Sequence, residues 1–276
     1  MLYVCATPIG NLGDVTPRVL EALRSVDLIA AEDTRRTRKL LARHDIHTPL
    51  TSLFAHNEAE KTERVLGLLR VGKDVALVTD AGMPAVSDPG MRLVARAAAE
   101  GLPLTVLPGP SAVTTALVAS GLAAEDGFRF VGYLPRRAAE LRAALAGWRR
   151  HGGVVVAFET GKRVGKSLAE LAEAAPAVAG AVCRELTKLH EEVVRGTLRE
   201  LAARYPAGDA VKGEITLVIG LGAPVDDRER VDEEVRAAAA LLLSKGLSRR
   251  DAAAALTVCF GLAANRAKRI VASVPS

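Results

Sequence analysis

The sequence has few cysteines and no long uninterrupted apolar run. Its three cysteines, Cys5, Cys183 and Cys259, are far apart and odd in number. This indicates a reducing, cytoplasmic compartment and argues against a disulfide framework or a metal site, so we expect three buried thiols. No window approaches twenty uncharged apolar residues, which argues against a membrane span. A strand-like run over 2–6 opens the chain without a basic segment before it, which argues against a signal peptide.

Most of the chain also lacks an excess of either charge. The net charge of +5 is carried by the last 32 residues, whereas the remainder is balanced. Such asymmetry favours a polyanionic partner, and a solvated basic helix face is the alternative. The cations of this tail are Lys245, Arg249, Arg250, Arg266, Lys268 and Arg269.

The chain is long enough for more than one domain, and its hydrophobic residues recur with the periods of strands and helices. Its 276 residues, 49% of them hydrophobic, suffice for two or three domains with a sizeable core. Short apolar strands alternate with helical patterns in the first part, which predicts a parallel α/β domain over 1–120. The expected strands are 2–6, 27–31, 51–55, 74–79 and 104–107, and the expected helices are 17–25, 35–44, 58–70, 90–100 and 111–120.

A second α/β domain is predicted over 121–222. The loop between the strand-like runs 179–186 and 191–196 is short. This indicates an antiparallel hairpin, so the sheet of this half is mixed rather than parallel. We expect strands at 127–132, 154–158, 179–186, 191–196 and 214–220, and helices at 138–149, 164–175 and 197–204.

The sequence after 222 predicts a linker over 223–227 and a helical domain over 228–276. Its expected helices are 229–244, 248–257 and 264–273, with a turn at Cys259–Leu262. This order is similar to a helix-turn-helix, which can place a basic helix on nucleic acid. It is equally an ordinary way to pack three small helices.

The most informative segment follows the apolar run 75–78. It is crowded with glycine, proline and acid, and it carries Asp80 and Asp88 but no Lys or Arg between Asp80 and Pro89. A loop at the carboxyl end of a buried strand is where open α/β sheets bind ligands. Phosphate sites need backbone donors and cations, so this loop favours a ligand with hydroxyls, an amine or a positive centre.

Other strand ends supply further candidates. The loop over 6–14 lacks the G-x-G-x-x-G pattern of dinucleotide sites and is either a simple turn or a wall of a ligand cleft. Ser111 is a candidate helix N-cap beside free backbone donors. The run 161–167 is one residue too short between its glycines for a P-loop, so its cations suit substrate contact better. The remaining strand-end groups lie at 32–39, 56–58, 183–188 and 212–214.

Together these segments resemble a known family, the small-subunit ribosomal RNA methyltransferase I enzymes of the tetrapyrrole-methylase superfamily. The similarity covers roughly 1–221 in order and spacing, and the tail is similar to that family's C-terminal helix-turn-helix. The matching motifs are Thr7–Leu12, Ala31–Arg35, His56–Glu58, Thr79–Gly90, Pro108–Ser111, Arg184–Lys188 and Lys212–Glu214.

The resemblance implies an S-adenosylmethionine enzyme that methylates the 2′-hydroxyl of a cytidine in the decoding region of small-subunit ribosomal RNA. It implies a homodimer with the cofactor between two α/β domains of each chain. Met83 stands where the family usually has Thr, and Lys162 where it usually has His. By position, the cofactor contacts would be Pro8, Ile9, Asp80, Ala81, Gly82, Met83, Pro84, Ser111, Ala112, Phe158, Leu186, Gly213 and Glu214.

A ribose hydroxyl is a weak nucleophile, so positioning, worth up to roughly 7–11 kcal/mol, outweighs a general base at about 10²–10⁴-fold. The candidate bases are Glu32, Asp33, His56, Glu185 and Lys212, with Glu185 or a neutral Lys212 preferred. From the distribution of charge, we expect cations to contact the phosphates of the RNA, whether it is free or in an assembled subunit. These cations are Arg35, Arg36, Lys39, Lys162, Arg163, Lys188, Arg249, Arg250, Arg266, Lys268 and Arg269. Rival hypotheses are a corrinoid methyltransferase and a non-catalytic RNA-binding assembly factor.

Overall fold

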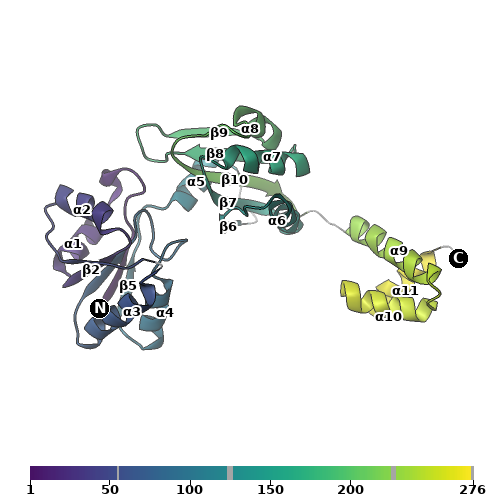
Figure 1. Ribbon diagram of the computed structural model, residues 1–276, viewed down its shortest axis with the longest axis horizontal. Helices are drawn as coiled ribbons and strands as arrows, with labels where there is room; N and C mark the ends of the chain where they lie inside the picture. The colour runs from purple at the N-terminus through teal and green to yellow at the C-terminus, as the bar shows by residue number, and fades with distance from the viewer. Residues whose placement is uncertain (55, 123–126, 225–227, 275–276) are drawn as a thin grey trace. The chain divides into compact units, whose positions relative to one another are not determined.

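The computed structural model describes residues 1–54, 56–122, 127–224 and 228–274 (Figure 1). The chain forms two compact units, one of Met1–Trp148 with Gly153–Gly222 and one of Arg149–Gly152 with Ala223–Ser276. Part of the predicted linker, 225–227, lies outside the described residues.

The first sheet of the larger unit is wholly parallel, as predicted, with the order β3-β2-β4-β1-β5. All four residues of β4 are buried because its neighbours and helices cover both sides, as in parallel sheets generally. Adjacent β1 and β4 bring the loops that follow them together, and Thr7 and Gly82 exchange two backbone hydrogen bonds of 2.9 Å. The strands are β1 (Leu2–Cys5), β2 (Leu28–Ala31), β3 (Leu50–Ser52), β4 (Val75–Val78) and β5 (Leu104–Leu107).

Helices cover both faces of this sheet and divide its core into two clusters. Successive strand residues point to opposite faces, so Ala76 packs in one cluster and Leu77 in the other. Thr16 accepts the backbone N–H of Val19 at 3.3 Å and caps the first helix, as its Thr-Pro sequence predicts. The helices are the 3-10 turn η1 (Leu12–Asp14), which the sequence did not reveal, α1 (Pro17–Ser25), α2 (Thr34–Arg43), α3 (Glu58–Arg70) and α4 (Met91–Ala99).

The second sheet is mixed, as predicted, with the order β6-β7-β10-β8-β9. Only β6 and β7 pair in parallel, and the expected hairpin is the antiparallel pair β8–β9. Its strands are β6 (Phe128–Tyr133), β7 (Gly153–Thr160), β8 (Ala179–Arg184), β9 (Glu192–Thr197) and β10 (Glu214–Gly222), and its helices are α6 (Ala138–His151), α7 (Val164–Ala174) and α8 (Leu198–Arg204).

Helix α5 (Ala112–Ser120) packs on this second sheet although it lies within the first 120 residues. Val113 and Ala116 are buried with Val154 and Val218 of that sheet. The helix has little polarity on any face, so its periodicity gives no direction for packing. Its position was therefore decided by tertiary contacts.

The smaller unit is a three-helix cluster with its own buried core. The three helices are α9 (Arg228–Ser244), α10 (Arg249–Phe260) and α11 (Ala264–Ser273). The predicted turn at Cys259–Leu262 was placed too early, because α10 continues to Phe260 and ends at Gly261, which has a left-handed backbone. None of the described helices is long and apolar enough to cross a membrane.

The prediction of three buried thiols was correct for two of them. Cys5 and Cys183 are buried, and burial raises their thiol pKa values to about 12 and about 11. Cys259 is exposed, between Val258 and Phe260, whose side chains are also exposed. A three-helix unit of this size cannot cover every face of each helix.

Candidate functional site

A cavity of about 350 Å³ lies in the larger unit and is lined by residues from both of its sheets. The wall from the first sheet comes from the loops after β1, β2 and β4. The opposite wall comes from the ends of β6, β7, β8 and β10 with the start of α5. This is the size of a small-molecule site at the strand ends where parallel sheets bind ligands.

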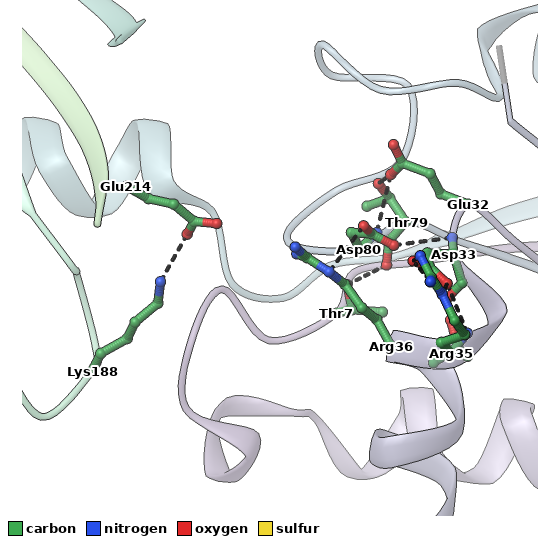
Figure 2. Close-up of polar contacts among 10 residues, drawn as sticks. Thr7, Glu32, Asp33, Arg35, Arg36, Thr79, Asp80, Lys188 and Glu214 are labelled. Carbon is green, nitrogen blue, oxygen red and sulfur yellow. Dashed lines mark hydrogen bonds and ion pairs between the residues drawn. The ribbon is translucent and has the colours of Figure 1, made fainter. Parts of the chain in front are cut away.

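Glu32 holds the start of the acidic loop after β4 in place through hydrogen bonds. Its Oε2 accepts the Thr79 hydroxyl at 2.7 Å and the Asp80 backbone N–H at 3.2 Å. Asp80 in turn accepts the backbone N–H of Asp33 at 3.0 Å, so the ends of β2 and β4 are cross-linked by carboxylates (Figure 2). Strands β2 and β4 are neighbours in the sheet, which brings these carboxylates and their partners within hydrogen-bond distance.

The loop after β4 has an unusual backbone. Ala85 and Ser87 have φ values of 67° and 68°, which non-glycine residues rarely adopt. Glu58 accepts the backbone N–H of Gly90 at 2.9 Å and anchors the far end of the loop. Strained residues of this kind cluster at functional sites, and here they direct Val86 and Asp88 to the cavity wall.

The cavity is strongly acidic. Five carboxylates line it, whereas Arg36, at 3.4 Å from Asp80, is the one cation among the described lining residues. Desolvation and the nearby Glu32 raise the pKa of Asp80, and the same two causes raise the pKa of Asp88 to about 6. A cation therefore suits this site. The lining carboxylates are Glu32, Asp80, Asp88, Glu159 and Glu214.

Two of these carboxylates belong to networks in the opposite wall. Glu159 is buried, accepts the Ser167 hydroxyl at 2.6 Å and pairs with Arg163 at 3.2 Å. Glu214 pairs with Lys188 at 2.9 Å, which Figure 2 shows reaching toward it. Lys188 also binds Glu185 at 2.8 Å, so its ammonium group connects two loops of this wall.

The start of α5 supplies backbone donors to the cavity. Ser111 is at the N-cap, but its side chain makes no cap hydrogen bond, which differs from the capping expected from sequence. The first N–H groups of a helix lack intrahelical partners and attract anions. Ser111 and Ala112 both line the cavity, so one end of an acidic site also suits a carboxylate.

Most of the residues that the resemblance assigns to the cofactor line this cavity. Pro8 and Pro84 are buried beside it and are not among its lining residues. The lining members are Ile9, Asp80, Ala81, Gly82, Met83, Ser111, Ala112, Phe158, Leu186, Gly213 and Glu214.

The candidate bases are dispersed. Glu32 lines the cavity, whereas the other four do not belong to its lining residues. Asp33 caps α2, and its hydrogen bonds with Arg35 lower its pKa to about 2. Glu185 accepts Lys188 and the Glu214 backbone N–H, which lower its pKa. His56 and Lys212 are exposed.

Several cations assigned to RNA are engaged within the protein. Arg35 pairs with Asp33, and Arg163 donates to the carbonyl oxygens of Leu134 and Pro135. Arg249 donates to three carbonyl oxygens at the end of α11. Lys39, Lys162, Arg250, Lys268 and Arg269 are exposed, and Arg266 is half-buried.

A second depression, of about 20 Å³, lies beside the start of α6. Its charged lining residues are Arg163 and Lys166, two cations of the 161–167 run, with Arg136, which the sequence had not singled out, and one carboxylate, Glu170. Arg163 also contacts Glu159 of the main cavity wall. A basic depression therefore adjoins the acidic cavity.

The sequence prediction missed Tyr133 and Glu159 among the lining residues, and it named Asp88 only as an acid of the loop. Glu159 had a signal, because it follows the apolar run Val154–Phe158 directly at a strand end. Tyr133 had none, since its orientation depends on an irregular strand pairing. No group of three or more metal-ligating side chains was found among the described residues.

Comparison with known proteins identifies the fold. The family model of tetrapyrrole (corrin/porphyrin) methylases matches residues 1–202. Among solved structures, uroporphyrin-III C-methyl transferase from Thermus thermophilus complexed with S-adenyl homocysteine has a TM-score of 0.56 at 19% identity, over 79% of this chain and 96% of that one. The fold is thus that of the tetrapyrrole methylases.

Curated relatives narrow this class. Ribosomal RNA small subunit methyltransferase I of Micromonospora olivasterospora is 45% identical over 87% of this chain and 75% of its own length. The protein of that name from Synechocystis sp. is 41% identical over 91% and 90%. The chain belongs to the ribosomal RNA small subunit methyltransferase I family, which confirms the resemblance found in the sequence.

Proposed function

We propose that this protein transfers a methyl group from S-adenosylmethionine to small-subunit ribosomal RNA, at the 2′-oxygen of a cytidine in the decoding region. The observation that carries the proposal is the acidic cavity of about 350 Å³ at the strand ends of a member of this family. The cellular site we propose is the cytoplasm.

The residues present fit the cofactor, which would supply a methyl group on a positively charged sulfur. The carboxylates of Glu32, Asp80 and Asp88 match the positive charge. The free N–H groups at the start of α5 match a carboxylate. The apolar side chains of Phe158, Ile9 and Leu186 offer a surface for a purine ring.

The protein groups contribute mainly by positioning and by excluding water. Glu32 holds Thr79 and Asp80 through hydrogen bonds, so the loop is organised before a ligand enters. Glu32 is the candidate base that faces the cavity, and we infer that it is better placed to accept a proton than Glu185, whose carboxylate already binds Lys188.

Methyl transfer from isotope-labelled S-adenosylmethionine tests the function. The acceptors are purified small ribosomal subunits lacking the modification, the corresponding free RNA, and a free tetrapyrrole. We expect label on a ribose 2′-oxygen of the RNA, at a nucleotide that mapping identifies. Label on the tetrapyrrole, or cofactor binding without transfer to any RNA, would contradict the proposal.

The affinity for S-adenosylmethionine is expected to rise with pH through about 6. Asp88 has its pKa raised to about 6 by desolvation and by Glu32 and Asp80, so it is neutral below that pH and attracts a cation only above it. Tyr133 faces it, and Arg36 opposes part of the acidic charge. Below pH 6 the loss of affinity should approach, and not exceed, about tenfold per pH unit, the limit for one titrating group.

The neutral product S-adenosylhomocysteine serves as the control ligand, because it lacks the sulfur charge. Calorimetric titration between pH 5 and 7.5 should show a much flatter dependence for it, and Asp88→Asn should flatten the cofactor curve. Identical curves for the two ligands would rule out this role of Asp88.

RNA affinity is expected to depend steeply on salt, because the exposed cations would displace counterions from phosphates. Arg136→Gln and Lys166→Gln, in the basic depression, should each reduce the slope of log K against log salt by about 1. Arg137→Gln is the matched control, since this neighbouring residue pairs with Glu140 and does not line the depression. Filter binding at several salt concentrations measures the slopes, and equal slopes for all variants would contradict the assignment.

We also propose that the protein is a homodimer. Val106 on the edge strand β5 is 49% exposed and Val118 on α5 is 79% exposed, and contact with a second copy would remove their apolar surface from water. Light scattering after gel filtration measures the mass. A monomer at micromolar concentration would contradict the proposal.

A further inference from the structure

Tyr133 is directed into the cavity by an irregularity at the end of β6. Phe130 pairs with Val156 of β7, but Tyr133 pairs with Phe158, so β6 holds an extra residue over this interval. Gly132 has a φ of 68° within the irregularity. Bulges re-aim side chains beside active sites, and Tyr133 lines the cavity while remaining 58% exposed.

The ring of Tyr133 has aromatic support behind it and open space beside it. Its centroid lies 5.7 Å from that of Phe158 in an edge-to-face arrangement, and Phe158 contacts Phe130 in the same way at 4.9 Å. The three rings hold each other in position. Only 3% of the sequence is aromatic, so a largely exposed ring at the cavity is a distinctive surface.

The charge around Tyr133 indicates which part of an RNA can approach it. Desolvation raises the pKa of its phenol, and the carboxylates of Asp88 and Glu214 raise it further, so the ring stays neutral at physiological pH. The same carboxylates repel phosphate groups. The part of a nucleotide that fits here is therefore the uncharged base, with its phosphates kept toward cations elsewhere.

We propose that Tyr133 is the surface on which the target nucleobase stacks when its ribose enters the cavity, an inference that rests on the proposed function. A nucleotide must leave its own stack to reach an enclosed reaction site. An aromatic side chain replaces the lost stacking, because every base has a π-face. Tyr133 thus contributes to RNA binding, whereas Phe158, half-buried next to it, lines the cavity that we assign to the cofactor.

The test compares Tyr133→Leu, which removes the π-face, with Tyr133→Phe, which keeps it. For the acceptor mapped by methyl transfer, the leucine variant should raise KM for RNA by about 5- to 150-fold with an unchanged Kd for S-adenosylmethionine. The phenylalanine variant should remain within about twofold of the wild type. Phe128→Leu is the control, because Phe128 is 46% exposed on the same strand and does not line the cavity.

A fluorescent base analogue at the mapped nucleotide gives a second readout. Its emission should be quenched on binding to the wild type and to Tyr133→Phe, and not to Tyr133→Leu. An unchanged KM for RNA in the leucine variant, or a parallel rise in the Kd for S-adenosylmethionine, would overturn the stacking role while the methyltransferase function stands. If the wild-type protein itself methylates no RNA, both proposals fail together.

Discussion

The Gly161→Ala substitution is expected to lower the melting temperature by about 6–12 °C. A Cβ atom at this position would overlap the carbonyl oxygen of Val211, and the obstacle is backbone rather than a flexible side chain. The Gly161 carbonyl also accepts the Val211 N–H at 3.0 Å. Overpacking costs about 3 kcal/mol or more in such a case, and each kcal/mol shifts Tm by roughly 2–4 °C for a domain of this size.

The same change should weaken cofactor binding, because Gly161, Gly213 and Glu214 line the cavity together. Gly67→Ala is the matched control: Gly67 lies inside α3 with nothing near its missing side chain, so alanine should stabilise the protein by about 1 kcal/mol. Differential scanning calorimetry measures both variants. A Gly161→Ala protein that melts like the wild type would show that the 211–213 segment moves freely.

Glu32→Ala is expected to reduce the affinity for S-adenosylmethionine by about 10- to 150-fold. The substitution removes an acceptor for the Thr79 hydroxyl and the Asp80 N–H, and a hydrogen bond to a charged group contributes about 1.5–3 kcal/mol. It also removes one of the five carboxylates of the cavity. The loop after β4 would lose its anchor and the site would lose negative charge.

Glu32→Gln separates these two effects, because it keeps an acceptor and removes the charge. We expect it to weaken S-adenosylmethionine more than S-adenosylhomocysteine in calorimetric titrations. Glu63→Ala is the control, since Glu63 pairs with Arg96 at the surface and does not line the cavity. Equal losses for the two ligands in Glu32→Gln would show that charge is not the reason for the effect.

The secondary structure could be predicted because its signals are local. The alternation of short apolar runs and amphipathic patterns located the strands and most helices, and Thr16-Pro17 located a helix start. The strand expected over 51–55 already ends at Ser52. The end of α10 was placed three residues too early, because the helix continues through Cys259 and Phe260. Gly261 was the better signal, because a left-handed residue ends a helix.

The candidate site was predicted in part. The resemblance placed Asp80, Ser111 and Ile9 at one cofactor site, and all three line the cavity. Roles for Glu185 and Lys212 were also predicted, but the sequence did not reveal that Glu185 binds Lys188 and a backbone N–H. Such partners depend on loop conformations that local patterns do not specify.

The sequence by itself determined the family, the parallel and mixed halves, and the acidic character of the loop after β4. These follow from residue order, because motif spacing and hydrophobic period are properties of the chain. Only the tertiary structure decided that α5 packs on the second sheet and that Tyr133 faces the cavity. It also decided that Asp88 titrates near pH 6. Each of these depends on contacts between distant segments, since burial and the approach of like charges arise only when the chain has folded.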